Sequence, residues 1–94
     1  MIYHVYAQPD TGEELIKANL SLTDAHKLAA GYLLRGSKQP PVEITHEDGE
    51  SLEWWVLTKE GAHVTSDLGS PLRAYTREQM YKMARGPTSP TRRR

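Results

Sequence analysis

The sequence predicts an α+β fold: an antiparallel sheet of about five strands in the order β-β-α-β-β-β-α, with one main helix packed on one face and a short C-terminal helix. Two observations support this: short alternating segments separated by turns, and two stretches that begin with capping-box patterns. The 94 residues are enough for one small domain, and the absence of cysteine excludes a disulfide framework. We expect this domain to span residues 1–86, followed by a disordered basic tail at 87–94.

The first hairpin is expected from residues 2–8 and 14–20, which alternate between apolar and polar side chains around a turn that contains Gly12. A four-residue loop gives three apolar pairs on one face: Ala7 with Ile16, Val5 with Ala18, and Tyr3 with Leu20. The other face then carries a mixed set: Ile2, His4, Tyr6, Leu15, Lys17 and Asn19.

The main helix is predicted to begin at Ser21, because Ser21 and Asp24 have the spacing of a capping box. Its apolar residues recur with helical periodicity: Leu22, Ala25, Leu28, Ala29, Tyr32 and Leu33. We expect Gly36 to cap its C-terminus and Pro40-Pro41 to lead the chain into the next strand.

A second hairpin is predicted from residues 42–46 and 52–57 around Glu47-Asp48-Gly49. A three-residue loop pairs Ile44 with Leu52, Val42 with Trp54, and Glu43 with Glu53, whereas a two-residue loop would place Ile44 opposite Glu53. We prefer the first register because it keeps apolar residues together. It places Trp54 on the helix-covered face, and Trp55 and Leu57 on the other.

A third turn at Lys59-Glu60-Gly61 is expected to pair Val56 with Val64 and to add a short strand near residues 62–66. Residues 66–71 are predicted to form a loop. Thr76 and Gln79 then match a second capping box, so we expect a helix over residues 77–85, with Tyr75 and Met80 in contact as its hydrophobic staple.

No residue pattern indicates catalysis. The four histidines lack the spacing of a metal site, and there is no nucleophile elbow or phosphate-binding loop. We therefore expect no enzyme, no cofactor and no metal.

An aromatic and acidic sheet face is the predicted contact surface for a protein partner, because exposed aromatic residues mark interaction sites. Its residues are Trp55, Leu57, Tyr6, Glu43 and Glu53. The competing interpretation is that the second helix folds back over Trp55 and buries it. A chain without catalytic motifs then suits a non-enzymatic interaction or regulatory module, such as a bacterial or phage accessory or inhibitor protein.

The charge is divided along the chain: residues 1–71 carry five Lys/Arg and eleven Asp/Glu, whereas residues 72–94 carry seven and one. The alternative function is therefore nucleic-acid binding through basic residues of the C-terminal region: Arg73, Arg77, Lys82, Arg85, Arg92, Arg93 and Arg94. The same charges would also allow a homodimer or a solvated tail. Without a signal peptide or a long apolar segment, the chain is expected to be cytoplasmic and not to bind a membrane.

Overall fold

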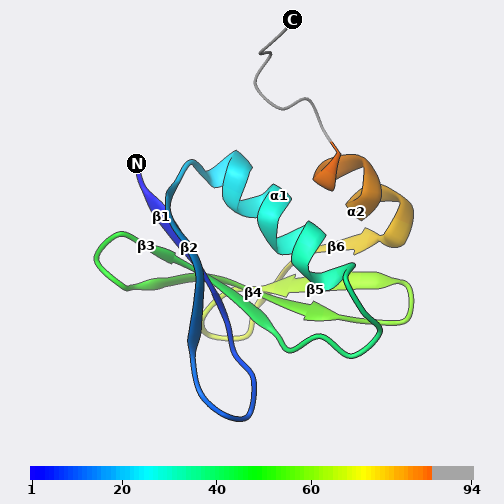
Figure 1. Cartoon of the computed structure of the whole chain (residues 1–94), viewed down its shortest axis with the longest axis horizontal. Helices are drawn as coiled ribbons and strands as arrows, with labels where there is room; N and C mark the ends of the chain where they lie inside the picture. The colour runs from blue at the N-terminus through cyan, green and yellow to red at the C-terminus, as the bar shows by residue number, and fades with distance from the viewer. Residues whose placement is uncertain (86–94) are drawn as a thin grey trace, which may run out of the picture.

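The computed structural model describes residues 1–85, which form six strands and two helices (Figure 1). In chain order these are β1 (Tyr3–Ala7), β2 (Glu14–Leu20), α1 (Leu22–Leu33), β3 (Val42–His46), β4 (Ser51–Leu57), β5 (Gly61–Thr65), β6 (Pro71–Thr76) and α2 (Arg77–Ala84). The strands form one antiparallel sheet in the order β2-β1-β3-β4-β5-β6. This confirms the predicted α+β fold, with β6 as a strand that the sequence did not reveal.

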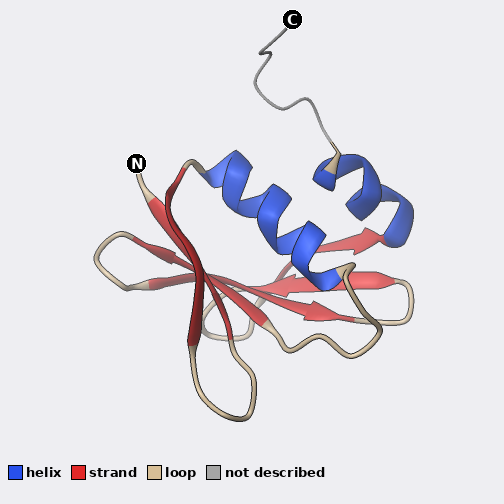
Figure 2. Ribbon diagram, in the orientation of Figure 1, coloured by secondary structure: helices blue, strands red, loops and turns tan. Residues whose placement is uncertain are grey.

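Both helices lie on the same side of the sheet, and no helix of the described residues covers the other side (Figure 2). The helix-covered side holds the core, in which Val5, Ile44, Trp55 and Val64 are fully buried. Helix α1 contributes small side chains together with Leu33, and α2 contributes Met80. We call the uncovered side of the sheet the open face.

The helix starts follow the predicted capping patterns. The Ser21 side chain accepts a hydrogen bond from the backbone N–H of Asp24, and Thr76 and Gln79 form the full reciprocal box at α2. Helix α1 ends with Leu34 as its C-cap, so Gly36 is not the cap that the sequence suggested. No helix within residues 1–85 is long and apolar enough to span a membrane.

The register of β4 differs from the prediction and exchanges the two tryptophans between faces. At the turn, His46 N–H donates to the carbonyl of Glu50, and Gly49 has a positive φ of 93°, as a three-residue loop requires. A β-bulge then shifts the register, so that Val42 pairs with Trp55. Because one residue of slip reverses the faces of a strand, Trp55 lies in the core and Trp54 on the open face.

The neighbouring strand follows this shift. The turn after β4 has two residues, since the N–H of Thr58 donates to the carbonyl of Gly61, and Trp55, not Val56, pairs with Val64. In the first hairpin the pair Tyr3 with Leu20 is confirmed, but two bulges shift the other predicted pairs.

Candidate functional site

The predicted contact surface is divided by the observed register. Trp55 is fully buried beneath the helices and Leu57 packs against the core, so the structure corrects their placement on the uncovered face. Trp55 stacks on Tyr75 of β6, with ring centroids 5.3 Å apart, and its ring centroid lies 5.5 Å from that of His26 in α1. Trp55 is thus buried within the chain, as the competing interpretation expected, but its aromatic contacts come from β6 and α1 and not from the second helix that was expected to cover it.

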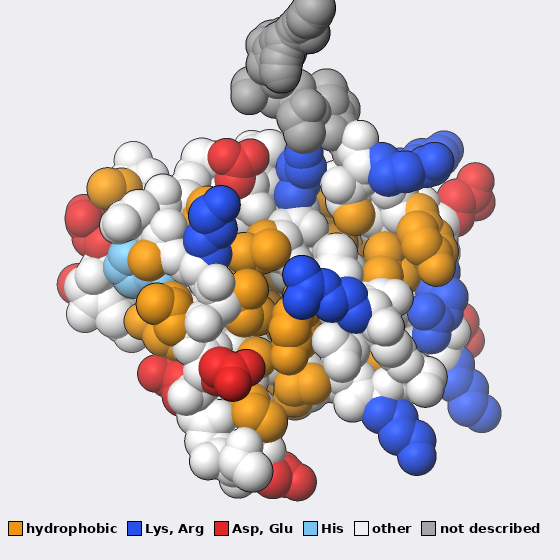
Figure 3. All heavy atoms as spheres, in the orientation of Figure 1, with side chains coloured by type: hydrophobic (Ala, Val, Ile, Leu, Met, Phe, Trp, Pro, Cys, Tyr) orange, Lys and Arg blue, Asp and Glu red, His pale blue; other side chains and the backbone are white. Residues whose placement is uncertain are grey.

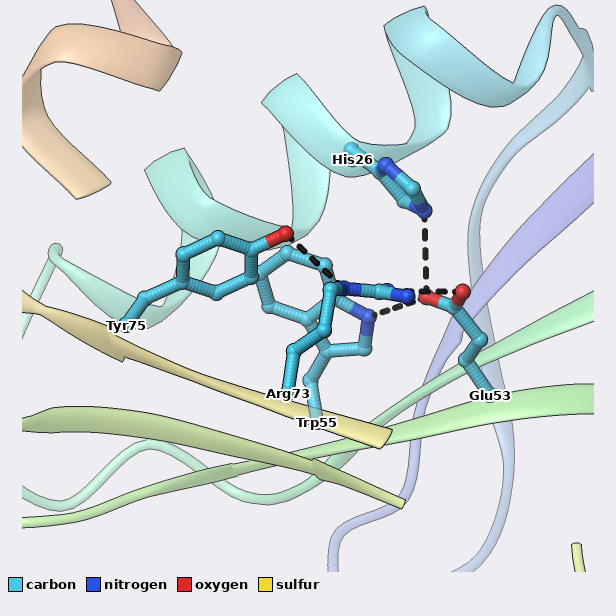
Figure 4. A network of polar contacts seen from close by, with 5 residues as sticks. All are labelled: His26, Glu53, Trp55, Arg73 and Tyr75. Carbon is cyan, nitrogen blue, oxygen red and sulfur yellow. Dashed lines mark hydrogen bonds and ion pairs between the residues drawn. The ribbon is translucent and has the colours of Figure 1, made fainter. Parts of the chain in front are cut away.

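Glu53 is the centre of a polar network that the sequence did not reveal (Figure 4). Glu53 is 4% exposed and lies on the helix-covered side. It pairs with Ile44, which is the pairing that the sequence analysis had rejected because it mixes apolar and charged residues on one face. Arg73 Nη2 lies 2.7 Å from its Oε2, and Trp55 Nε1 donates to its Oε1 over 2.9 Å. His26 Nε2 lies 3.1 Å from the same Oε1.

These contacts keep Glu53 ionised. Burial raises the pKa of Glu53, but the contacts with His26, Arg73 and Trp55 lower it by more, and the resulting pKa is about 2, compared with 4.5 for an ordinary glutamate. Burial lowers the pKa of Arg73, and the ion pair with Glu53 raises it above its ordinary value. The network joins α1, β4 and β6, so we assign it a structural role in holding the helix and the outer strand to the sheet.

The open face carries a row of directly paired side chains that crosses five strands. From β2 to β5 these residues are Leu15, Tyr6, Glu43, Trp54 and Thr65. Leu15 is 53% exposed, and Trp54 and Tyr6 are half-buried. Beside this row, Val56 and Leu72 are 43% and 44% exposed. Tyr6 and Glu43 of the predicted contact surface are thus retained here, and Trp54 takes the place expected for Trp55.

The predicted acidic surface is smaller than expected. Glu43 is only 9% exposed, because it lies between Tyr6 and Trp54 and accepts a hydrogen bond of 2.7 Å from Gln8 Nε2. Glu43 and Glu53 lie on opposite faces, so the predicted like-charge pair does not form. The exposed carboxylates of this hairpin are those around its turn: Glu47, Asp48 and Glu50.

The predicted basic residues do not form one surface. Arg73 is bound to Glu53, whereas Arg77, Lys82 and Arg85 line one hollow on α2 together with Tyr81. Arg92, Arg93 and Arg94 lie outside the described residues, as does the predicted tail at 87–94.

Within residues 1–85 no group of three or more His, Asp or Glu residues is arranged to hold a metal ion. A search of family models, curated proteins and solved structures found no match to this chain.

Proposed function

We propose that this chain is a non-enzymatic interaction module that binds a protein partner through the open face. The observation that carries the proposal is that Leu15, Tyr6 and Trp54, in one row with the nearly buried Glu43, lie on a sheet face that no described helix covers. Leu15, Val56 and Leu72 are each more than 40% exposed there. Contiguous exposed apolar surface of this kind is typical of interaction sites, and tryptophan and tyrosine are enriched at their centres.

The dimensions of the face are compatible with a small interface. Six strands spaced about 4.8 Å apart extend about 24 Å, and five residues of strand extend about 17 Å. Such a face covers about 400 Å², so the loops at its rim would contribute the remaining part of the roughly 600 Å² per partner that the smaller specific interfaces bury. A module of this kind acts by occupying a surface of its partner, which suits a cytoplasmic accessory or inhibitor protein of a bacterium or phage.

A charged substitution on the open face tests this function. We expect Val56→Lys to abolish recovery of a protein partner by affinity capture from an extract of the native cells, because it places a charge in the apolar surface. Leu68→Lys is the matched control, since Leu68 is 91% exposed in the loop before β6. Both variants should keep the far-ultraviolet circular dichroism of the parent chain. Equal recovery of the partner by both variants would exclude the open face.

Self-association is a separate outcome of the same experiment. If the parent chain sediments as a dimer and Val56→Lys as a monomer, the partner of the open face is a second copy of the chain. In that case the open face is still the contact surface, but it forms a homodimer and does not bind a different protein.

Nucleic-acid binding is a second candidate, favoured by the hollow on α2. Arg77, Lys82 and Arg85 line the same hollow as Tyr81, which is 50% exposed, and cations together with an aromatic ring suit phosphates and stacked bases. Glu78 lies in the same hollow, 4.0 Å from Lys82, and weakens this potential.

Salt-dependent binding to DNA tests the second candidate. If three phosphates are contacted, the logarithm of the affinity should fall with the logarithm of the salt concentration with a slope of about −3. The triple substitution Arg77→Gln, Lys82→Gln, Arg85→Gln should remove the signal. DNA binding whose affinity does not change with the salt concentration would exclude nucleic acid as the partner.

A further inference from the structure

A groove of about 380 Å³ lies on the helix-covered side of the molecule, between β2, α1 and α2. Its apolar lining includes Leu20, Leu28 and Tyr32, and its far wall is formed where Gly31 of α1 approaches Ala84 of α2. Figure 3 shows apolar side chains exposed on this side, over α1, with separate Lys and Arg side chains around them. The volume lies within the range of pockets that hold small molecules, which is about 300 to 1,000 Å³.

The charge around this groove is mostly positive. Lys17, Lys27 and Arg35 line it, and Asp24 is the single carboxylate in the lining. The guanidinium carbon of Arg35 lies 5.5 Å from the centre of the Tyr32 ring, so this cation is placed beside the apolar surface. An apolar floor with two more cations than anions is complementary to an anionic ligand that has an apolar body.

The local backbone of β2 places one of these cations. With the regular hairpin register, Lys17 would belong to the open face. Instead it lies between two register shifts and pairs with Val5, whose side chain is buried under the helices. Between Lys17 and Leu20, Asn19 has a positive φ of 63°, and its N–H donates to His4 Nδ1 over 3.1 Å. Bulges often re-aim side chains beside binding sites, and a left-handed asparagine is uncommon within a strand.

We propose that this groove binds a small organic anion: a carboxylate or sulfonate attached to an aromatic or short aliphatic body. Lys17 and Arg35 attract the anionic group, and the body lies on Leu20, Leu28 and Tyr32. The site is on the opposite side of the sheet from the open face, so it is independent of the proposed protein interaction.

Fluorescence titration with anilinonaphthalene sulfonate, an aromatic sulfonate, tests this site. We expect one saturable site, with affinity reduced about threefold to tenfold by Lys17→Glu and by Arg35→Glu, since each reverses one partner of an exposed charge pair. Lys59→Glu is the matched control, because Lys59 lies in the turn after β4 and carries the same charge. It should bind within about twofold of the parent chain. The neutral analogue N-phenylnaphthylamine should bind more weakly, and its affinity should change little with any of the three substitutions.

Amide chemical shifts provide the second measurement. Addition of the sulfonate to the full chain should shift the amide signals of Leu28 and Gly31 and leave those of Val56 and His63, on the open face, unchanged. The proposal is overturned if the open-face signals move instead, or if Lys59→Glu weakens binding as much as Lys17→Glu and Arg35→Glu do.

Discussion

Replacing Glu53 with glutamine tests whether the buried carboxylate stabilises the fold through its charge. Glutamine keeps the size of the side chain and an acceptor for Trp55 Nε1, but it removes the ion pair with Arg73. A pKa of about 2 in place of 4.5 corresponds to about 3 kcal/mol of stability at pH 7. Because the Arg73 side chain is 36% exposed, solvent screens part of the pair, and we expect Glu53→Gln to cost about 2 kcal/mol.

The stabilisation by Glu53 should decrease as the pH falls. Glu53 has a lower pKa in the folded state, so its contribution is complete above the unfolded value of 4.5 and is lost as the pH falls toward about 2. The difference in unfolding free energy between the parent chain and Glu53→Gln should therefore be similar at pH 7 and pH 5. At pH 3 it should fall to about 1 kcal/mol.

Urea denaturation followed by tryptophan fluorescence measures these differences, since Trp55 is fully buried in the folded state. Glu78→Gln is the control, because Glu78 is 81% exposed and lies 4.0 Å from Lys82, and its cost should stay below about 0.5 kcal/mol. A cost of Glu53→Gln below about 0.5 kcal/mol at pH 7, or one that is equal at pH 3 and pH 7, would refute the argument.

Three further substitutions test the packing. Gly61→Ala places a Cβ against the backbone oxygen of Tyr75, so we expect a loss of more than about 3 kcal/mol in urea denaturation; a loss below 1 kcal/mol would mean that β5 and β6 are farther apart. Gly31→Ala should raise the melting temperature by about 4 to 8 °C, because alanine favours a helix interior and its Cβ would lie 3.7 Å from that of Ala84; a lower melting temperature contradicts this. Thr76→Ala removes the N-cap of α2 and should cost about 1 kcal/mol, seen as faster amide exchange in α2 than in α1; unchanged exchange would show that the cap does not stabilise the helix.

The parts of the fold that were predicted correctly depend on residues close together in the sequence. Ser21 and Thr76 cap their helices through backbone groups three residues away, and Gly49 adopts the left-handed conformation that its turn needs. Strand β6 was missed because Arg73 faces the helix-covered side, where an apolar residue would be expected. Its partner there, Glu53, was placed on the predicted contact surface of the other face, because the preferred register kept apolar residues together.

The candidate surfaces were predicted less well than the fold. Tyr6 and Glu43 lie on the open face, but the tryptophan of that face is Trp54, and the groove beside Lys17 was not foreseen. In both places a bulge changes which face a side chain joins. Nothing in the alternation of apolar and polar residues marks where a bulge occurs, because alternation assumes regular pairing.

Local hydrogen bonding and side-chain periodicity therefore specify the α+β class, both helix starts and the three-residue turn between β3 and β4. Local sequence does not specify which tryptophan is buried or where Lys17 of β2 points. Both depend on strand register, which is selected by contacts between distant segments. On β4 those contacts include Arg73 and His26 around Glu53, which allow a buried carboxylate where the sequence pattern favoured an apolar residue.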